Sequence, residues 1–286
     1  MTGAAGMLGR RVVADARERG WDVVGIDLAE ADLTDAPETR AAVHEIGPDA
    51  VIHCAAWTDV DGAEAHQELA LAVNRDASAN LARAAADAGA RVVAVSTDYV
   101  FDGTLTGRPY VESDPVSPIG AYGRTKLEGE RAVRAATANH AIARTAWLFG
   151  AGGKSFPDTM LRLGADREAV AVVTDQIGSP TWTGHLSPAL LDLAASDATG
   201  VFHTAGGGQC SWHELTVELY RRAGVTARVD ETTAAEFARP APRPAWSVLD
   251  TERDETPRLP PWQEGVAGFL AERAAPAPSL DESENA

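Results

Sequence analysis

The chain of 286 residues is long enough for one large α/β domain, or for such a domain with a smaller lobe. Its formal net charge of −17 argues against a nucleic-acid partner, and no apolar run approaches the roughly 18 residues of a membrane span. Cys54 and Cys210 stand in no metal-binding spacing, so we expect a reduced, cytoplasmic protein without a metal site or a membrane partner.

Short β-branched runs alternate with Ala-rich helical stretches through the first half of the chain. Strands are predicted at residues 22–27, 50–53, 91–96 and 140–145, and helices at residues 10–19, 63–88 and 125–136. This alternation predicts βαβ units, and therefore a Rossmann-type, doubly wound parallel sheet with helices on both faces. We assign residues 1–150 to this dinucleotide-binding domain.

The pattern changes after about residue 150, where Pro and Gly become frequent and the predicted elements shorten. Residues 151–273 are expected to form mainly a smaller substrate-binding lobe, with some segments returning to the Rossmann sheet. The acidic residues 274–286 are expected to be a disordered tail.

Three glycines near the N-terminus, Gly3, Gly6 and Gly9 in TGAAGMLG, come just before a predicted helix. Glycines at this spacing let the backbone turn tightly and approach a pyrophosphate at the helix N-terminus. Asp27 follows about 20 residues later, where an acid suits the adenosine ribose hydroxyls. Glycines alone often form only a turn, but the placement of Asp27 favours a nicotinamide dinucleotide site.

The strand that normally precedes such a glycine turn is missing from the sequence, which starts at Met1. A first strand of this kind lies in the centre of the sheet, and its loss leaves backbone groups unpaired at roughly 1–3 kcal/mol each. We therefore expect that Met1 marks a mis-assigned start at a GTG codon, and that the natural chain begins several residues upstream. Without that strand, the chain as written can be inactive despite intact catalytic residues.

Tyr122 and Lys126 form a YxxxK pattern at the start of a predicted helix. Positions i and i+4 share one helical face, so the ammonium can lie near the phenol, whose usual pKa is about 10. The alternative is an exposed helix with a surface lysine, but Lys154 is the only other lysine, and chance gives about 0.03 such pairs. We predict that Tyr122 is the proton donor, and that Lys126 lowers its pKa and holds the nicotinamide ribose.

Two hydroxyl residues, Ser96 and Thr97, stand at the end of the third predicted strand. Side chains at the carboxyl end of a central parallel strand face the ligand crevice, although Ser and Thr often merely cap a strand. Thr97 is the first choice for holding a carbonyl oxygen, and Ser96 is the second. His53 and Asn74 are weaker candidates, because a buried Asn satisfied by the backbone fits the pattern as well as a water-mediated link to the lysine.

These motifs together resemble the dTDP-4-dehydrorhamnose reductase family of the extended short-chain dehydrogenase/reductase superfamily. STDYVFDG and DQIGSPT are specific to that family, whereas YxxxK marks only the superfamily. HCAAWTDVDGAE, AVNRDASANLA, RTAWLFG and RPAWSVLD match further family segments in order, so the resemblance covers most of the chain. Lys154 departs from the family pattern, which usually has Asn-Phe in this loop; it could bind a diphosphate or be a solvated loop residue.

The resemblance implies a role for each matching residue. The catalytic residues are Thr97, Tyr122 and Lys126. The cofactor is expected to lie against Gly3, Gly6, Met7, Leu8, Gly9, Asp27, Asp32, Leu33, Ala55, Ala56, Thr58, Asn74, Ser96, Tyr122 and Lys126. The substrate is expected to lie against Thr97, Asp98, Val100, Tyr122 and Trp147, with the indole near the sugar.

The implied reaction is reduction of the 4-keto group of dTDP-4-dehydro-6-deoxy-L-mannose to dTDP-L-rhamnose, with NADPH or NADH. Asp27 favours NADH because it would repel a 2′-phosphate, whereas Arg10 and Arg11 could meet that phosphate. The resembled family accepts either cofactor. On the strength of that resemblance we expect, by a slight margin, NADPH. Mg²⁺ is implied by the resemblance alone, and the chain is expected to be a monomer or a homodimer.

Three alternatives remain open at this point. The same motifs would serve a reductase of another dTDP-keto-deoxysugar, such as a precursor of dihydrostreptose, 6-deoxytalose or an antibiotic sugar. A dehydratase or epimerase of the superfamily is a second alternative, although a dehydratase would want an Asp-Glu pair where this chain has Asp98 and Tyr99. A non-catalytic regulatory subunit is a third, and the intact Thr97, Tyr122 and Lys126 argue against it.

Overall fold

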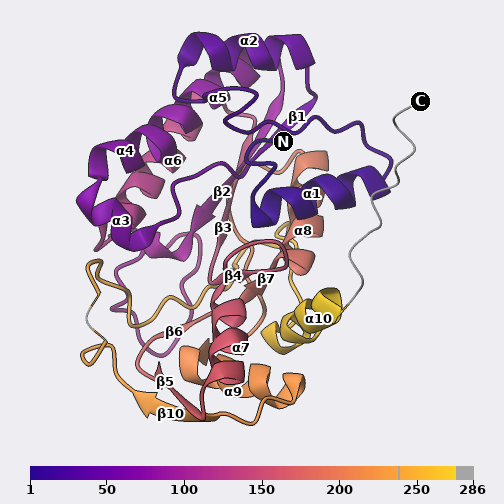
Figure 1. Cartoon of the computed structure of the whole chain (residues 1–286). Helices are drawn as coiled ribbons and strands as arrows, with labels where there is room; N and C mark the ends of the chain where they lie inside the picture. Colours follow the sequence, from indigo (N-terminus) through magenta and orange to yellow (C-terminus); the bar gives the residue numbers. More distant parts are fainter. Residues whose placement is uncertain (238, 275–286) are drawn as a thin grey trace.

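The computed structural model describes residues 1–237 and 239–274, with a parallel sheet at the centre and a smaller group of elements beside one end of it (Figure 1). The first part of the chain forms α1 (Met7–Glu18), α2 (Ala36–Ile46), β1 (Ala50–His53), α3 (Val60–Ala65), α4 (Gln67–Leu71), η1 (Ala72–Asp76), α5 (Ala77–Asp87), β2 (Arg91–Thr97), η2 (Asp98–Val100), α6 (Ala121–Ala136) and β3 (His140–Thr145). The remainder forms β4 (Leu148–Phe149), α7 (Phe156–Asp166), β5 (Ala169–Val173), β6 (Ile177–Gly178), β7 (Thr181–Trp182), α8 (Thr183–Ala195), β8 (Gly200–His203), β9 (Cys210–Ser211), α9 (Trp212–Ala223), β10 (Arg228–Thr232) and α10 (Trp262–Ala274).

The central sheet is parallel throughout and has the order β1–β2–β3–β8. Thr2 extends it beyond β1, because this residue bridges His53 on one side and Ile26 on the other, both in parallel. From Thr2 the chain passes first to Ile26, on one side of Thr2 in the sheet, and then crosses to β1, on the other side. The order of strands in the sheet therefore reverses at Thr2. In sheets of this kind a ligand binds outside the carboxyl ends of the strands at such a reversal. The predicted Rossmann-type sheet is confirmed, including the strands at residues 50–53, 91–96 and 140–145.

The predicted strand at residues 22–27 is wrong except at Ile26. The amide of Ile26 donates to the Met1 carbonyl at 2.7 Å, and in parallel register the partners of the earlier residues would precede Met1. Residues 22–25 therefore have no neighbouring strand to pair with. The Met1 ammonium donates instead to the carbonyl oxygen of Val24 at 2.9 Å. Residues 1–6 form no strand, as the sequence predicts, and only the isolated bridges of Thr2 to Ile26 and to His53 occupy the position of a first strand.

Helices cover both faces of the sheet because successive strand residues point to opposite sides. On one face Leu8 of α1 and Leu190 of α8 share a buried cluster with Val93 of β2. On the other face Leu81 of α5 packs with Val92 of the same strand. Each cluster removes apolar surface from water, which is the main source of stability for a layered fold of this type.

The single helix predicted for residues 63–88 is wrong in its continuity. The chain breaks at His66 between α3 and α4, and then passes through the π-helical turn η1, which contains Asn74. Helix α6 lies close to this turn, since a Cβ added to Gly129 would overlap the carbonyl oxygen of Asn74. π turns are often found at functional sites. Here the π turn η1 packs against α6, the helix that carries Tyr122.

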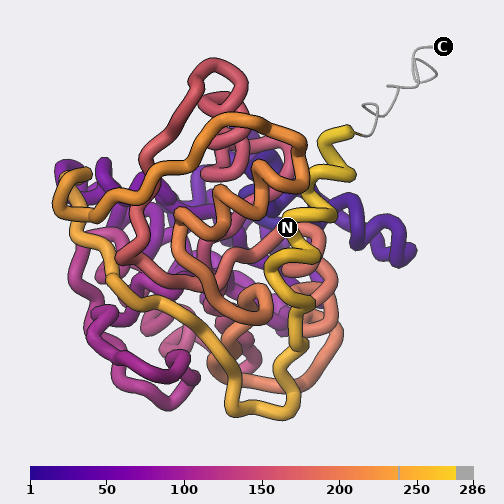
Figure 2. The backbone as a smooth tube through the Cα atoms, turned by 90° about the horizontal axis from the view of Figure 1, so that it is seen from below, coloured from indigo at the N-terminus to yellow at the C-terminus, as the bar shows by residue number. Residues whose placement is uncertain are grey.

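The smaller lobe is built around α7, α9 and α10 and the parallel pair β5–β10. Its core includes Leu215, Leu219 and Phe269, none of which has exposed surface. After β10 the chain runs as a long loop down one side of the molecule and returns as α10 (Figure 2). No helix within the described part of the chain is long and apolar enough to cross a membrane.

The domain boundaries drawn from the sequence stay a prediction. β8 pairs with β3, and α8 packs against α1, so two elements of the later part of the chain lie in the layers of the main sheet. The tail predicted for residues 274–286 falls, from residue 275 onwards, outside the described residues.

Candidate active site

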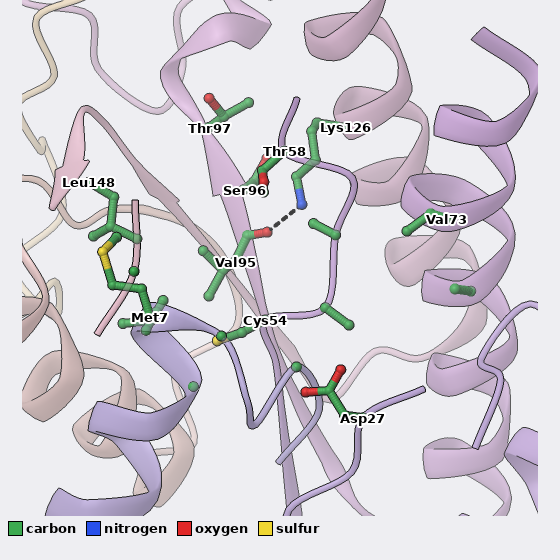
Figure 3. A pocket seen from close by; sticks show the side chains of 18 of the residues that line it. Met7, Asp27, Cys54, Thr58, Val73, Val95, Ser96, Thr97, Lys126 and Leu148 are labelled. Carbon is green, nitrogen blue, oxygen red and sulfur yellow. Dashed lines mark hydrogen bonds between the residues drawn. The ribbon is translucent and has the colours of Figure 1, made fainter. Parts of the chain in front are cut away.

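A pocket of about 830 Å³ opens at the carboxyl ends of the central strands, within the size range of small-molecule sites. Figure 3 shows Ser96, Thr97 and Lys126 toward one end of it and Asp27 toward the other. The residues predicted from the sequence that line this pocket are Gly3, Gly6, Met7, Leu8, Gly9, Asp27, Asp32, Leu33, Ala55, Ala56, Thr58, Ser96, Thr97, Asp98, Tyr122, Lys126 and Trp147. The structure therefore brings nearly the whole predicted site to one cavity.

The glycine turn has the geometry of a phosphate-binding loop. Gly3 has a φ of +67°, and a Cβ there would lie 2.7 Å from the amide nitrogen of Ala55. A Cβ on Gly9 would overlap the carbonyl oxygen of Gly3. Gly6 is the N-cap of α1, and no side chain caps this helix, so its first N–H groups and its dipole favour an anion there.

Tyr122 and Lys126 of helix α6 line the pocket. The start of this helix packs closely against η2. A Cβ added to Gly123 would overlap the carbonyl oxygen of Tyr99, so only glycine lets the helix approach this turn. The Lys126 side chain is 8% exposed, and its Nζ donates to the carbonyl oxygen of Val95 at 2.8 Å (Figure 3). That bond fixes the ammonium at the end of β2, beside the pocket wall.

Burial sets the protonation of both groups. Desolvation lowers the pKa of Lys126 to about 8, partly offset by the negative charge of Glu130. Desolvation raises the pKa of Tyr122 to about 12, while the nearby Thr97 hydroxyl lowers it and the Asp98 charge raises it further. Burial therefore outweighs the nearby polar groups in setting the pKa of Tyr122, and the lowering expected from Lys126 stays a prediction. Tyr122 stays a neutral phenol near pH 7, which is the form that can donate a proton.

Thr97 and Asp98 form a buried hydroxyl–carboxyl pair at the pocket wall. Thr97 Oγ1 lies 3.0 Å from Asp98 Oδ1 and accepts the amide of Tyr99 at 3.2 Å. Asp98 is 2% exposed, and its Oδ2 has no hydrogen-bond partner among the described residues. Desolvation raises the pKa of Asp98 to about 7, against the lowering effect of the nearby Ser247 and Thr97 hydroxyls. A buried carboxyl group with a raised pKa thus faces the pocket.

Ser96 is committed to a buried ion pair behind the pocket. Its Oγ donates to Glu130 Oε1 at 2.6 Å, and Arg144 donates to the two oxygens of the same carboxylate at 2.9 and 2.8 Å. Glu130 and Arg144 are 3% and 2% exposed. Ser96 therefore helps to hold α6 against β2 and β3, and Thr97 is the other hydroxyl at this strand end that lines the pocket.

Asn74 and Val100 do not lie on the pocket wall. The Asn74 side chain accepts the amide of Trp57 at 2.9 Å and donates to Thr125 Oγ1 at 3.0 Å, so its polar atoms are used within the protein. Val100 has no exposed surface and packs in a cluster with Phe101. The roles given to these two residues by resemblance stay predictions without support from this geometry.

His53 is a structural residue at the edge of the site. It is 3% exposed, its Nδ1 lies 2.7 Å from Thr2 Oγ1, and its Nε2 lies 3.0 Å from Ser78 Oγ. Burial, together with the positive charge of Lys126, lowers the pKa of His53 to about 3. A permanently neutral imidazole with both nitrogens bonded ties the first strand position to α5.

Trp147 has a strained backbone and a fixed side chain. Its φ is +47°, in the left-handed region, which costs a bulky residue about 1–3 kcal/mol. Its ring stacks on Trp212 with centroids 3.5 Å apart and planes at 2°, and a Cβ on Gly178 would overlap its indole. The lobe thus holds this indole rigidly against the pocket, in line with its predicted contact to a sugar.

The sequence reasoning missed several wall residues, among them Val73, Cys54 and Thr145. Thr145 ends β3 as Thr97 ends β2, so the rule of hydroxyls at strand ends could have found it. Cys54 is a free thiol whose pKa burial raises to about 12. No cluster of His, Cys, Asp or Glu suited to a metal occurs within residues 1–237 and 239–274.

Comparison with known proteins adds an independent finding. Residues 1–275 match the family described as RmlD substrate binding domain. A dTDP-4-dehydrorhamnose reductase of Streptomyces griseus is 44% identical over 268 residues, covering 91% of this chain and 88% of the relative. The chain belongs to the dTDP-4-dehydrorhamnose reductase family.

Two other members of the family bear on substrate and cofactor. A solved dTDP-4-dehydrorhamnose reductase of Bacillus anthracis, in complex with NADP, has a TM-score of 0.92 at 35% identity and covers 95% of this chain and 97% of its own. A dTDP-4-keto-6-deoxy-D-glucose reductase of Streptomyces niveus is 41% identical over 285 residues, 99% of this chain and 98% of the relative. The family thus includes reductases of more than one dTDP-linked keto sugar.

Proposed function

We propose that this member of the dTDP-4-dehydrorhamnose reductase family uses NAD(P)H to reduce the 4-keto group of dTDP-4-dehydro-6-deoxy-L-mannose, giving dTDP-L-rhamnose. The observation that carries the proposal is that Thr97, Tyr122 and Lys126 line the same pocket as the glycine turn. Relatives named for this reaction share the chain over most of its length.

The residues at the turn fit a dinucleotide. The uncapped N-terminus of α1 offers backbone N–H groups to a pyrophosphate, and Gly3 and Gly9 leave no side chain in its way. Asp27 lies on the wall where an adenosine ribose would be recognised. Bound at this position, the nicotinamide supplies the hydride.

The chain's own residues then handle the proton and the developing charge. Tyr122 is neutral and donates its proton to the alkoxide oxygen as that oxygen forms. Thr97 holds the same oxygen by a hydrogen bond that strengthens as charge builds on it. Lys126, fixed by the Val95 carbonyl, stabilises the resulting tyrosinate and is in place to bind a ribose hydroxyl.

The substrate end of the pocket is assigned to Asp98, Trp147 and Lys154. The rigid indole of Trp147 offers an apolar face to a deoxysugar, and Asp98 offers a carboxyl that can donate or accept. Lys154 lies on the wall, where an ammonium suits a diphosphate. The absence of a nucleic-acid or membrane partner, the cytoplasmic location and the monomeric or homodimeric state stay predictions, and no residue is assigned to Mg²⁺.

A different dTDP-linked 4-keto sugar is the second candidate substrate. The relative from Streptomyces niveus is named for such a reaction and is nearly as similar to this chain as the rhamnose enzyme. A regulatory subunit is disfavoured, because all three catalytic side chains are present and face one cavity.

The test is turnover with purified protein and dTDP-4-dehydro-6-deoxy-L-mannose, followed by nicotinamide absorbance and by identification of the product. Tyr122→Phe should lower kcat by about 10²–10⁴-fold and leave the Kd of the cofactor nearly unchanged. Tyr110→Phe is the matched control, because Tyr110 lies outside the pocket, and it should keep full activity. Near-normal kcat in Tyr122→Phe would contradict the assignment, and a higher kcat/KM with dTDP-4-keto-6-deoxy-D-glucose would favour the second substrate.

A further inference from the structure

Helix α6, which carries Tyr122 and Lys126, begins without a capping side chain of its own. Its N-cap is Gly120, which has an extended backbone at φ −114° and ψ 165° and no side chain to accept from the first N–H groups of the helix. Ser, Thr, Asp and Asn are preferred at this position because their side-chain oxygen satisfies one of these groups. Tyr122 is the second residue of α6, so whatever holds the first turn also holds the phenol.

A carboxylate from a distant segment takes the place of the missing cap. Glu64 of α3 accepts the amide of Ala121, the first residue of α6, with 2.6 Å between Oε1 and the nitrogen. A hydrogen bond to an ionised group is stronger than a neutral one, and a negative charge at a helix N-terminus also interacts favourably with the helix dipole. A Cβ added to Gly120 would lie 3.1 Å from Glu64 Oε1, so the glycine leaves room for this carboxylate.

Helix α3 is itself fixed to another part of the chain. Asp61, one turn before Glu64, accepts from the two terminal nitrogens of Arg243 at 3.1 and 3.0 Å and from the amide of Ala241 at 3.1 Å. Both members of this ion pair are mostly buried, since the Arg243 side chain is 14% exposed and that of Asp61 is 29% exposed. The Glu64 carboxylate therefore comes from an element that has a fixed position of its own.

The Tyr122 side chain packs against the same pair of helices. Ala63 of α3, Ala70 of α4 and Ala121 form a buried cluster, and Tyr122 packs against it. Helices α3 and α4 lie beside α6 (Figure 1). The Tyr122 ring also meets the ring of Tyr99 edge to face, with centroids 5.7 Å apart. A shift of the first turn of α6 relative to α3 would therefore move the phenol relative to the pocket.

We propose that Glu64 is a positioning residue for proton transfer from Tyr122, because its carboxylate fixes the first turn of α6 against α3. The inference rests on the proposed role of Tyr122 as proton donor. Glu64 does not line the pocket, so it acts through the helix and touches neither substrate nor cofactor. Proton transfer needs the donor oxygen within hydrogen-bond reach of its acceptor, and a misplacement of about 1 Å can cost about 10²-fold in rate.

The first experiment compares kcat, KM and the Kd of the cofactor in two Glu64 variants, with dTDP-4-dehydro-6-deoxy-L-mannose as substrate. Glu64→Ala removes the acceptor, so kcat should fall by about 10- to 100-fold while KM and Kd change by less than about twofold. Glu64→Gln keeps an oxygen that can accept the Ala121 amide and should recover most of kcat. Glu68→Ala is the matched control, because Glu68 is an exposed residue of α4 outside the pocket, and it should leave all three values unchanged.

A second substitution separates positioning from helix stability. Gly120→Ser in the Glu64→Ala background gives α6 a cap of its own, because the extended backbone suits a capping hydroxyl. With the Glu64 side chain removed, the nearest remaining neighbour of an added Cβ is the Pro242 carbonyl oxygen at 3.5 Å, an ordinary contact. This hydroxyl restores the cap but not the bond to α3. We expect the double variant to regain the Tm lost in Glu64→Ala and to keep the lowered kcat. Recovery of kcat together with Tm would overturn the proposal, since any cap would then serve.

Hydrogen exchange of the Ala121 amide, followed by NMR, tests the contact without turnover. This amide is bonded to Glu64, so it should exchange at least about tenfold faster in Glu64→Ala than in the wild type, and nearly at the wild-type rate in Glu64→Gln. An unchanged exchange rate or an unchanged kcat in Glu64→Ala would overturn the proposal. Failure of the proposed function would look different: the exchange results would hold, and the wild type would turn over no dTDP-linked keto sugar.

Discussion

At the catalytic end of the pocket the polar side chains are buried and bonded to the protein, whereas at the adenosine end they stand on a loop in contact with solvent. Thr97, Asp98 and Lys126 are 6%, 2% and 8% exposed, while Glu30 and Thr34 are exposed. Burial moves the pKa of Lys126 down and that of Asp98 up, but the pKa of the loop acid Asp32 is lowered by its neighbours' hydrogen bonds. The polar groups at the catalytic end therefore lie in the protein interior, and those at the other end lie on a surface loop.

This difference has a consequence for how the two ends can change. A substitution in the interior leaves a charge or a hydrogen-bonding group without its partner, so it affects folding together with catalysis. A substitution on the loop exchanges one solvated group for another and changes affinity alone. Stability measurements on variants at both ends can confirm or break the comparison.

The largest effect is expected at Glu130, behind the catalytic end. In Glu130→Gln the Arg144 guanidinium keeps its charge in a buried place without a counter-charge, which should lower the free energy of unfolding by about 3–5 kcal/mol. Urea unfolding at pH 7 measures it. Glu128→Gln on the same helix is the control, because its partner Arg131 is 58% exposed, and it should cost less than about 1 kcal/mol. Equal losses in the two variants would mean that the buried pair is not what holds α6.

An intermediate effect that depends on pH is expected at Asp98. Its folded pKa of about 7 lies above the unfolded value of 3.8, so the folded state binds the extra proton and loses stability as the pH rises between these values. Between pH 5 and pH 8 the wild type should lose roughly 2–3 kcal/mol through this group, and Asp98→Asn should not. Unfolding curves at the two pH values give the difference. A parallel pH dependence in both proteins would show that Asp98 is ionised throughout.

The smallest effect is expected at the adenosine end. Thr34 donates its amide and its hydroxyl to Asp32 Oδ1 at 2.9 and 2.7 Å, but both groups are open to water, so Thr34→Val should leave Tm nearly unchanged. Thr39→Val is the contrast: Thr39 is fully buried and donates to the carbonyl oxygens of Leu33 and Asp35, so its loss should lower Tm by a few degrees. A large drop in Tm for Thr34→Val would remove the distinction between the two ends.

The sequence was sufficient where a feature depends on local spacing. The strands at 50–53, 91–96 and 140–145, the glycine turn and the Tyr122–Lys126 pair each lie in one short segment, and all were found. Strand ends and helix faces then explain why the proposed catalytic residues share a pocket.

The rest depends on partners that are distant in sequence. The prediction of a strand at residues 22–27 was wrong because a strand needs a neighbouring strand along its whole length. The prediction of one helix at residues 63–88 was wrong because the chain forms a π turn where it packs against α6. The direction of the Tyr122 pKa shift follows from burial, which no pattern of residues reveals. The ion pair between Glu130 and Arg144 joins α6 to β3, and neither residue belongs to a sequence motif that predicts this contact.

The stacked indoles of Trp147 and Trp212 also provide an intrinsic optical probe of the pocket. Two indoles stacked 3.5 Å apart are in electronic contact, so a change in their stacking should change the tryptophan fluorescence of the protein. One indole faces the pocket and the other begins α9 in the lobe. Any ligand that tilts the first ring against the second therefore reports its arrival optically, without a label and without turnover.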